Sequence, residues 1–193
     1  MPARNPGIRS QACEYCGTIS LWDEAGHRDS GKKSMLPEGF TRLYRGATGT
    51  LRGRRFEVLG RVRYGYSRGM WDEWYIRLED GSTSWLTEDD HELCVEDEVG
   101  PAMLPDELEV GMVIPVADVP YLIREVGIAS CLGIEGQVPR AILPDETYGY
   151  ADGSSVDGTR TLGIEVDDVP PTFFVGHRLQ HEDVVLDDEG EDW

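Results

Sequence analysis

Two cysteines near the N-terminus have a spacing that suits metal chemistry. Cys13 and Cys16 form a CxxC knuckle, in which one tight turn can direct two thiolates toward the same ion. A structural zinc site needs four ligands, so the knuckle would need further partners such as His27 or the cysteines of a second chain. Zinc binding at this pair is one hypothesis, and a surface pair of free thiols is the alternative that we favour. A thioredoxin-like role is disfavoured, because it requires a βαβ context.

A second group of residues combines tryptophans with carboxylates. Neighbouring carboxylates can exchange protons with a substrate or bind a cation, and an acidic surface attracts polyamines. The structural alternative places Trp74 and Trp85 in the core, leaves Trp71 more exposed, and puts the acids on a solvated hairpin face. The candidate binding residues are Trp71, Asp72, Glu73, Trp74, Trp85 and Glu135.

Other chemistry-bearing patterns give little support to a catalytic role. His177 and His181 have an i, i+4 spacing, but their context VGHRLQHEDVV favours a turn and a strand, so a metal site there is disfavoured. The sequence has no GxSxG, HExxH, P-loop or dinucleotide fingerprint. These observations favour a protein that is not an enzyme.

The charge of the chain is strongly negative and unevenly distributed. The 193 residues carry a net charge of −19, and most of the basic residues lie within residues 1–69. A phosphate polyanion would be repelled by most of this surface, so nucleic acid is excluded as an expected partner. Residues 42–68 contain eight arginines and one acid, Glu57. We expect these arginines to pair with acidic residues of the C-terminal part of the chain.

The remaining cysteines and the hydropathy pattern bear on the expected cellular location of the protein. Cys94 and Cys131 lie in apolar, strand-like contexts and are predicted to be buried free thiols. No apolar run approaches the roughly 20 residues that span a bilayer. The N-terminus lacks the apolar stretch of a secretory signal. We therefore expect a cytoplasmic protein without a transmembrane segment.

The hydrophobic pattern predicts an all-β fold with little helix, built from two small SH3-like barrel or sandwich units in tandem. The knuckle and a linker occupy 1–40, and the linker runs from about Asp23 to Gly39. The first β-unit occupies 41–99 and the second 106–186, and a single domain over 41–186 is the competing interpretation. An acidic disordered tail is predicted over 187–193.

Within the first unit, WDEWYIRLEDGSTSWL is typical of a hairpin with a two-residue turn at Asp80–Gly81. A break in the alternation at Leu59–Gly60 predicts a β-bulge.

The second unit is predicted to contain strands at 112–116, 121–126 and 128–135. A long loop is predicted over 143–159, because this segment is rich in Gly, Asp and Ser. Two later strands, Thr161–Val166 and Thr172–Val175, are expected to pair, and residues 181–186 to close the unit.

Three sequence elements resemble a known family. They are FEVLGRV followed by WDEWYIRLEDGSTSWL, then IEGQVP at 134–139, then PPTFFVGHRL at 170–179. Together they are similar to the bacterial domain-of-unknown-function family numbered 4178, and the similarity covers about residues 41–186. The resemblance implies an all-β domain without a catalytic assignment and with an accessory role. Members often carry a four-cysteine zinc ribbon before the domain. CEYCG resembles the second knuckle of such a ribbon, but the first knuckle is missing.

These observations lead to three hypotheses about function. The preferred one is a non-enzymatic accessory or adaptor protein that acts through protein contacts. The resemblance implies that its partner belongs to a membrane-associated or stress-response complex. The second hypothesis is a binding module for a small cationic ligand such as a polyamine, and the third is an enzyme that uses the acidic residues of the WDEW hairpin.

Overall fold

The computed structural model describes residues 7–23, 26–39, 41–90 and 92–188. Within these ranges the chain is almost entirely β, as predicted, and its one helical element is the short 3-10 helix η1 (His181–Asp183). The strands are β1 (Ser10–Ala12), β2 (Thr18–Asp23), β3 (Gly26–Lys33), β4 (Thr48–Leu51), β5 (Arg54–Tyr66), β6 (Gly69–Leu78), β7 (Thr83–Asp89), β8 (Glu92–Val99), β9 (Val113–Val116), β10 (Val119–Val138), β11 (Thr147–Ser155), β12 (Thr161–Glu165), β13 (Thr172–Leu179) and β14 (Val184–Leu186).

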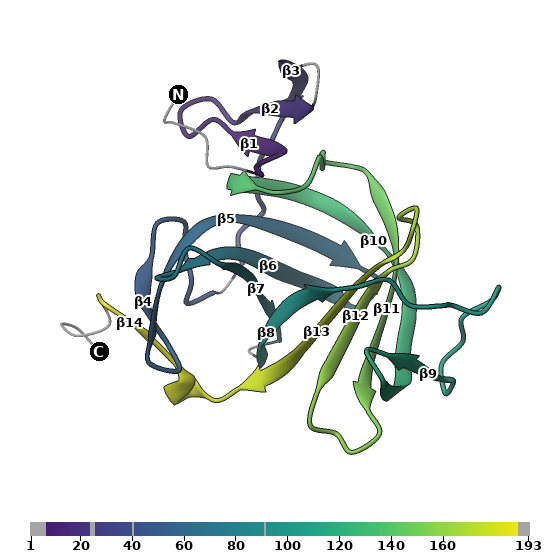
Figure 1. Ribbon diagram of the computed structural model, residues 1–193. Coiled ribbons are helices and arrows are strands. Elements are labelled where there is room, and N and C mark those ends of the chain that lie inside the picture. The colour runs from purple at the N-terminus through teal and green to yellow at the C-terminus, as the bar shows by residue number, and fades with distance from the viewer. Residues whose placement is uncertain (1–6, 24–25, 40, 91, 189–193) are drawn as a thin grey trace.

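Eight antiparallel strands close into a ring. Its order is β5–β6–β7–β8–β13–β12–β11–β10, and β10 returns to pair with β5 (Figure 1). The pairings β8–β13 and β5–β10 each join the first predicted unit to the second. The predicted SH3-like or sandwich arrangement of two units is therefore not confirmed, because the units share one continuous sheet.

Closure of the ring requires a very close approach between β13 and β8. Gly176 lies opposite Glu96 in this pairing, and a Cβ atom at Gly176 would lie 1.9 Å from the carbonyl oxygen of Val95. Only glycine fits such a contact. The ring is thus closed at a position where the sequence supplies no side chain.

A bulge in β5 moves its apolar side chains from one core to another. The register with β6 shifts between Val58 and Gly60, which confirms the bulge predicted at Leu59–Gly60. Before the shift, Phe56 and Val58 pack with Trp74 and the residues beside β4 and β14. After it, Val62 and Tyr64 pack into the cluster inside the ring. The bulge allows one long strand to serve two cores.

The hairpin between β6 and β7 is confirmed, but its turn is longer than predicted. Leu78 donates its backbone N–H to the Ser82 carbonyl at 2.8 Å, so the loop contains three residues, 79–81. Gly81 occupies the third position with φ of 84°. This is the left-handed conformation that three-residue hairpin loops require of a glycine.

The second predicted unit differs from the sequence prediction in three ways. The strands predicted at 121–126 and 128–135 are parts of one strand, β10, which is 20 residues long. The predicted loop over 143–159 contains β11, which pairs with β10 and β12. The segment 181–186 does not close the second unit, because β14 pairs with β4. The predicted pairing of β12 with β13 is confirmed.

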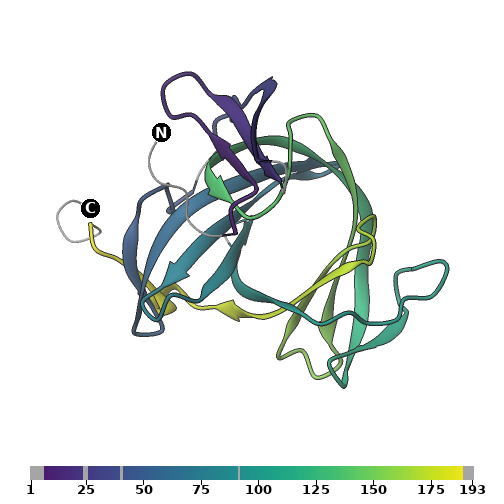
Figure 2. The same cartoon turned by 45° about the horizontal axis from the view of Figure 1, so that its top comes forward.

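The two ends of the chain are also more ordered than predicted. The predicted linker contains β3, which pairs with β2, and β1 pairs with the end of β10 (Figure 2). Asp187, assigned to a disordered tail, accepts hydrogen bonds from both terminal nitrogens of Arg55 at 2.6 Å. The rest of the predicted tail, 189–193, and residues 1–6, 24–25 and 40 of the predicted knuckle and linker lie outside the described residues.

The expected pairing of arginines with acidic residues is confirmed at six positions of the 42–68 segment. The ion pairs are Arg52–Asp183, Arg54–Asp80, Arg55–Asp187, Arg61–Glu135, Arg63–Asp72 and Arg68–Glu125. The described part of the chain holds no helix with the length and apolarity that a membrane crossing requires.

Candidate ligand-binding cavity

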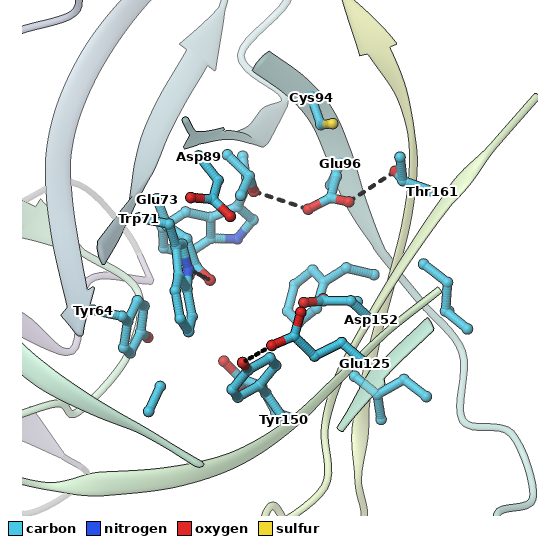
Figure 3. Close-up of a pocket in the computed structure, with 18 of the residues that line it drawn as sticks. Tyr64, Trp71, Glu73, Asp89, Cys94, Glu96, Glu125, Tyr150, Asp152 and Thr161 are labelled. Atoms are coloured by element: carbon cyan, nitrogen blue, oxygen red, sulfur yellow. Dashed lines mark hydrogen bonds between the residues drawn. The ribbon is translucent and has the colours of Figure 1, made fainter. Parts of the chain in front are cut away.

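A cavity of about 230 Å³ lies inside the ring, and every strand of the ring contributes to its wall. Its volume is below the range of roughly 300–1,000 Å³ that is usual for drug-sized ligands. The principal side chains of the wall are Tyr64, Tyr66, Trp71, Glu73, Trp85, Thr87, Asp89, Cys94, Glu96, Glu125, Tyr148, Tyr150, Asp152, Thr161 and Phe174. The wall therefore combines aromatic rings with carboxylates (Figure 3).

Trp71 is the centre of the aromatic part of the wall. It lies opposite Tyr64 in the β5–β6 register, and the two rings stack with centroids 4.9 Å apart. Its ring centroid lies 5.4 Å from that of Tyr66 and 5.3 Å from that of Tyr150. Cross-strand pairing thus places four rings from three strands around one space.

Glu125 and Asp152 form a like-charged pair in the wall. They lie directly opposite each other on β10 and β11, a placement that is unfavourable for two carboxylates. Glu125 accepts a hydrogen bond from the Tyr150 hydroxyl at 2.8 Å. Within the described ranges, the Asp152 carboxylate has no hydrogen-bond or ion-pair partner. Asp152 is therefore a charge that faces the cavity without compensation.

The pKa of Asp152 reflects this position. Burial, together with the neighbouring charges of Glu96 and Glu125, raises its pKa to about 7. Asp152 lines the cavity and its side chain remains accessible to water, so protein groups surround the carboxyl group without covering it. Burial also raises the pKa of Glu73, against the opposing effects of Arg140 and of the Trp71 indole.

Glu96 is held by two hydroxyl groups. Thr87 donates to one of its carboxylate oxygens at 2.9 Å, and Thr161 donates to the other at 2.8 Å (Figure 3). Burial raises the pKa of Glu96, and these two hydrogen bonds oppose that increase. The side chain is thus fixed in orientation, and no basic group among the described residues forms an ion pair with it.

Each arginine near the cavity is engaged with an acid, and Arg68 pairs with Glu125 of the wall. Arg140 pairs with Glu165, and its guanidinium carbon lies 5.0 Å from the centroid of the Phe174 ring. Arg178 is part of the cavity wall, and its guanidinium pairs with Glu92, which is not. The negative charge within the ring therefore exceeds the positive charge that faces it.

Comparison with protein families identifies the part of the chain that contains this cavity. The profile of DUF4178, a domain of unknown function, matches residues 45–181. The chain belongs to the DUF4178 family. Comparisons with curated proteins and with solved structures gave no match. The matched residues include all eight strands of the ring, so the cavity lies wholly within the DUF4178 domain.

In the DUF4178 domain, the six candidate binding residues from the sequence fall into two sets. Trp71, Glu73 and Trp85 line the cavity. The other three lie outside the cavity and make structural contacts. Asp72 accepts a hydrogen bond from Arg63, and Glu135 forms an ion pair with Arg61. Trp74 is buried in the second hydrophobic core.

The cysteines of the knuckle lie far along the chain from the cavity, before the DUF4178 domain. The Cys16 thiol is exposed and donates to the Thr18 hydroxyl at 3.2 Å, and Cys13 is partly exposed in the turn between β1 and β2. Across the described residues, no three His, Cys, Asp or Glu side chains are grouped to hold a metal ion.

The two remaining cysteines differ from each other. Cys131 is buried, as predicted. Cys94 is only partly buried and lines the cavity, so the prediction of a buried core position is wrong for this residue. Burial raises the pKa of the Cys94 thiol to about 12, which keeps it protonated near neutral pH.

Sequence reasoning missed the acids that define the cavity, Glu96, Glu125 and Asp152. Asp152 was hidden because β11, with the sequence TYGYADGSS, has the composition of a loop. The spacing of Tyr148, Tyr150 and Asp152 at every second residue was an available signal. It is the alternation expected of side chains that share one face of a strand.

Proposed function

We propose that the DUF4178 domain of this chain is a non-enzymatic binding module for a small organic cation of the polyamine type. The observation that carries the proposal is the unpartnered Asp152 carboxylate, which lies beside Glu125 in the wall of an aromatic-lined cavity. An ammonium group between these carboxylates would remove their mutual repulsion. It would also supply the hydrogen-bond donors that Asp152 lacks.

The aromatic wall suits the same ligand. Ammonium groups are attracted to the faces of tryptophan and tyrosine rings, and the methylene groups of a polyamine pack against them. The wall offers such rings at Trp71, Tyr66 and Tyr150. An extended cation fits the arrangement better than a metal ion, because the carboxylates are spread along the wall and are not grouped.

The other two hypotheses draw less support from the geometry. Asp72 and Glu73 project from opposite faces of β6, so the acids of the hairpin do not converge on one reacting atom. An accessory role through protein contacts concerns the outer surface and remains a separate prediction. The membrane-associated or stress-response partner is implied by the family resemblance alone.

Calorimetric titration with spermidine at pH 8 and low salt tests the proposal. We expect saturable binding that becomes weaker at pH 6, because Asp152, with a pKa of about 7, is then largely protonated. Asp152→Asn should weaken binding by at least about tenfold, since a hydrogen bond to a charged group contributes about 1.5–3 kcal/mol.

Glu107→Gln is the matched control, because Glu107 is an exposed acid outside the cavity wall. This variant should bind spermidine as the wild-type protein does. Absence of saturable heat with the wild-type protein, or equal losses in the two variants, would refute a site in the ring.

A further inference from the structure

Arg68 sits in the two-residue turn between β5 and β6 and reaches toward the wall of the cavity. Its guanidinium pairs with Glu125, which is the carboxylate that lies opposite Asp152. The Arg68 side chain is 66% exposed, whereas that of Glu125 is 29% exposed. The pair therefore lies where the cavity wall meets solvent.

The surroundings of the Arg68 guanidinium have the chemistry proposed for the ligand site. The guanidinium carbon lies 5.8 Å from the centroid of the Tyr66 ring, and the ring of Tyr66 lies 6.5 Å from that of Tyr150. Glu125 accepts from the Tyr150 hydroxyl through one oxygen and from Arg68 through the other. A cation of the chain itself thus already uses an aromatic face and a carboxylate of the wall.

We infer that the Arg68 side chain competes with ligands for the cation site. When an amine of the ligand enters the cavity, it displaces the Arg68 guanidinium from Glu125. The inference rests on the proposed function, because it assigns the regulation of that same site. Exposed ion pairs add little net stability, so the Arg68 side chain can leave Glu125 at small cost. Arg68 then returns to solvent, where its charge is hydrated.

This arrangement favours ligands that carry more than one positive charge. A cation with a single charge gains contact with Asp152 but does not compete well against a guanidinium at Glu125. A polyamine carries enough charge to satisfy Asp152 and to replace Arg68 at Glu125. Arg68 would therefore favour polyvalent over monovalent amines.

Titration of two variants with spermidine at pH 8 tests the inference. Arg68→Gln removes the competitor and should tighten binding by about fivefold, within the range expected for loss of an exposed ion pair. Arg54→Gln is the control for net charge, because Arg54 is 50% exposed and pairs with Asp80, and neither residue is part of the wall. Its affinity should change by less than about twofold.

The remaining outcomes are distinguishable. Equal gains in both variants would show a general charge effect and overturn the role of Arg68. Unchanged or weaker binding by Arg68→Gln, with wild-type binding intact, would overturn this inference and leave the proposed function standing. If neither the wild-type protein nor Arg68→Gln binds spermidine, the proposed function and the inference both fail.

Discussion

Asp72 and Glu73 are neighbours on β6, yet their carboxylates have opposite surroundings. Asp72 is 5% exposed and accepts two hydrogen bonds from Arg63, at 2.8 and 2.5 Å. Glu73 faces the cavity and accepts one hydrogen bond, at 3.2 Å, from the Trp71 indole. Strand alternation places one acid in a neutralised network and the next in a cavity of excess negative charge.

The comparison separates structural acids from acids that are available to a ligand. On the outer face of the ring, Arg61 pairs with Glu135 at 3.0 Å and lies 4.6 Å from the Trp74 ring centroid. Arg63 donates to the Pro37 carbonyl in addition to Asp72, so its guanidinium holds the preceding segment against the sheet. On the inner face, no arginine or lysine of the described part of the chain pairs with Asp152. Acidic side chains lie on both faces, and what differs is their pairing with arginines.

The largest effect should follow from breaking the paired side. Arg63→Met leaves Asp72 buried without its bidentate partner. We expect the free energy of unfolding to fall by about 3–5 kcal/mol, the usual cost of removing one member of a buried pair. Urea unfolding at pH 7 measures this change.

Arg54→Gln is the control for this variant, because Arg54 lies on the same strand as Arg63, but both side chains of the Arg54–Asp80 pair are at least half exposed. Its removal should cost about 0–1 kcal/mol. Similar losses in the two variants would contradict the structural importance of the Asp72 network.

The sequence predicted the hairpin on the paired side better than the cavity, but the expected solvated hairpin face is wrong for Asp72, which is buried. The hairpin of β6 and β7 follows from local alternation and a Gly at the turn, so Trp71, Trp74 and Trp85 could be assigned to faces from the sequence alone. The ring closes through β5–β10 and β8–β13, whose partners are far apart in sequence and carry no local signal. Asp152 could not be placed, because the pairing of β11 with two neighbours overrides its loop-like composition.

A smaller effect should appear when the unpaired side is neutralised. The pKa of Asp152 in the folded protein, about 7, exceeds that of an unfolded aspartate, about 3.9. Between these values the folded state binds more protons, so this residue makes the free energy of unfolding fall as the pH rises. Asp152→Asn should therefore stabilise the protein at pH 8 and have little effect at pH 4.

We expect a gain at pH 8 of about 1 kcal/mol, or about 2–4 °C in Tm. This value is below the full linkage value, because the surface of Asp152 is accessible to water in the cavity. Thermal unfolding of both proteins at the two pH values measures the difference, and Glu107→Gln should show none. A loss of stability at both pH values would instead identify Asp152 as a structural acid like Asp72.

The smallest effect concerns Glu96, which is intermediate between the structural acid Asp72 and the unpaired acid Asp152. Two hydroxyl groups hold its carboxylate, but no arginine among the described residues pairs with it. Thr161→Val removes one of its two donors, so the pKa of Glu96 should rise further and stability should fall by less than about 1 kcal/mol. Spermidine should then bind more weakly to the variant than to the wild-type protein, and the difference should decrease as the pH is raised. Thr172→Val, whose hydroxyl donates to Asp168 outside the cavity, is the control. A loss of affinity that is independent of pH would mean that Thr161 acts through shape and not through the charge of Glu96.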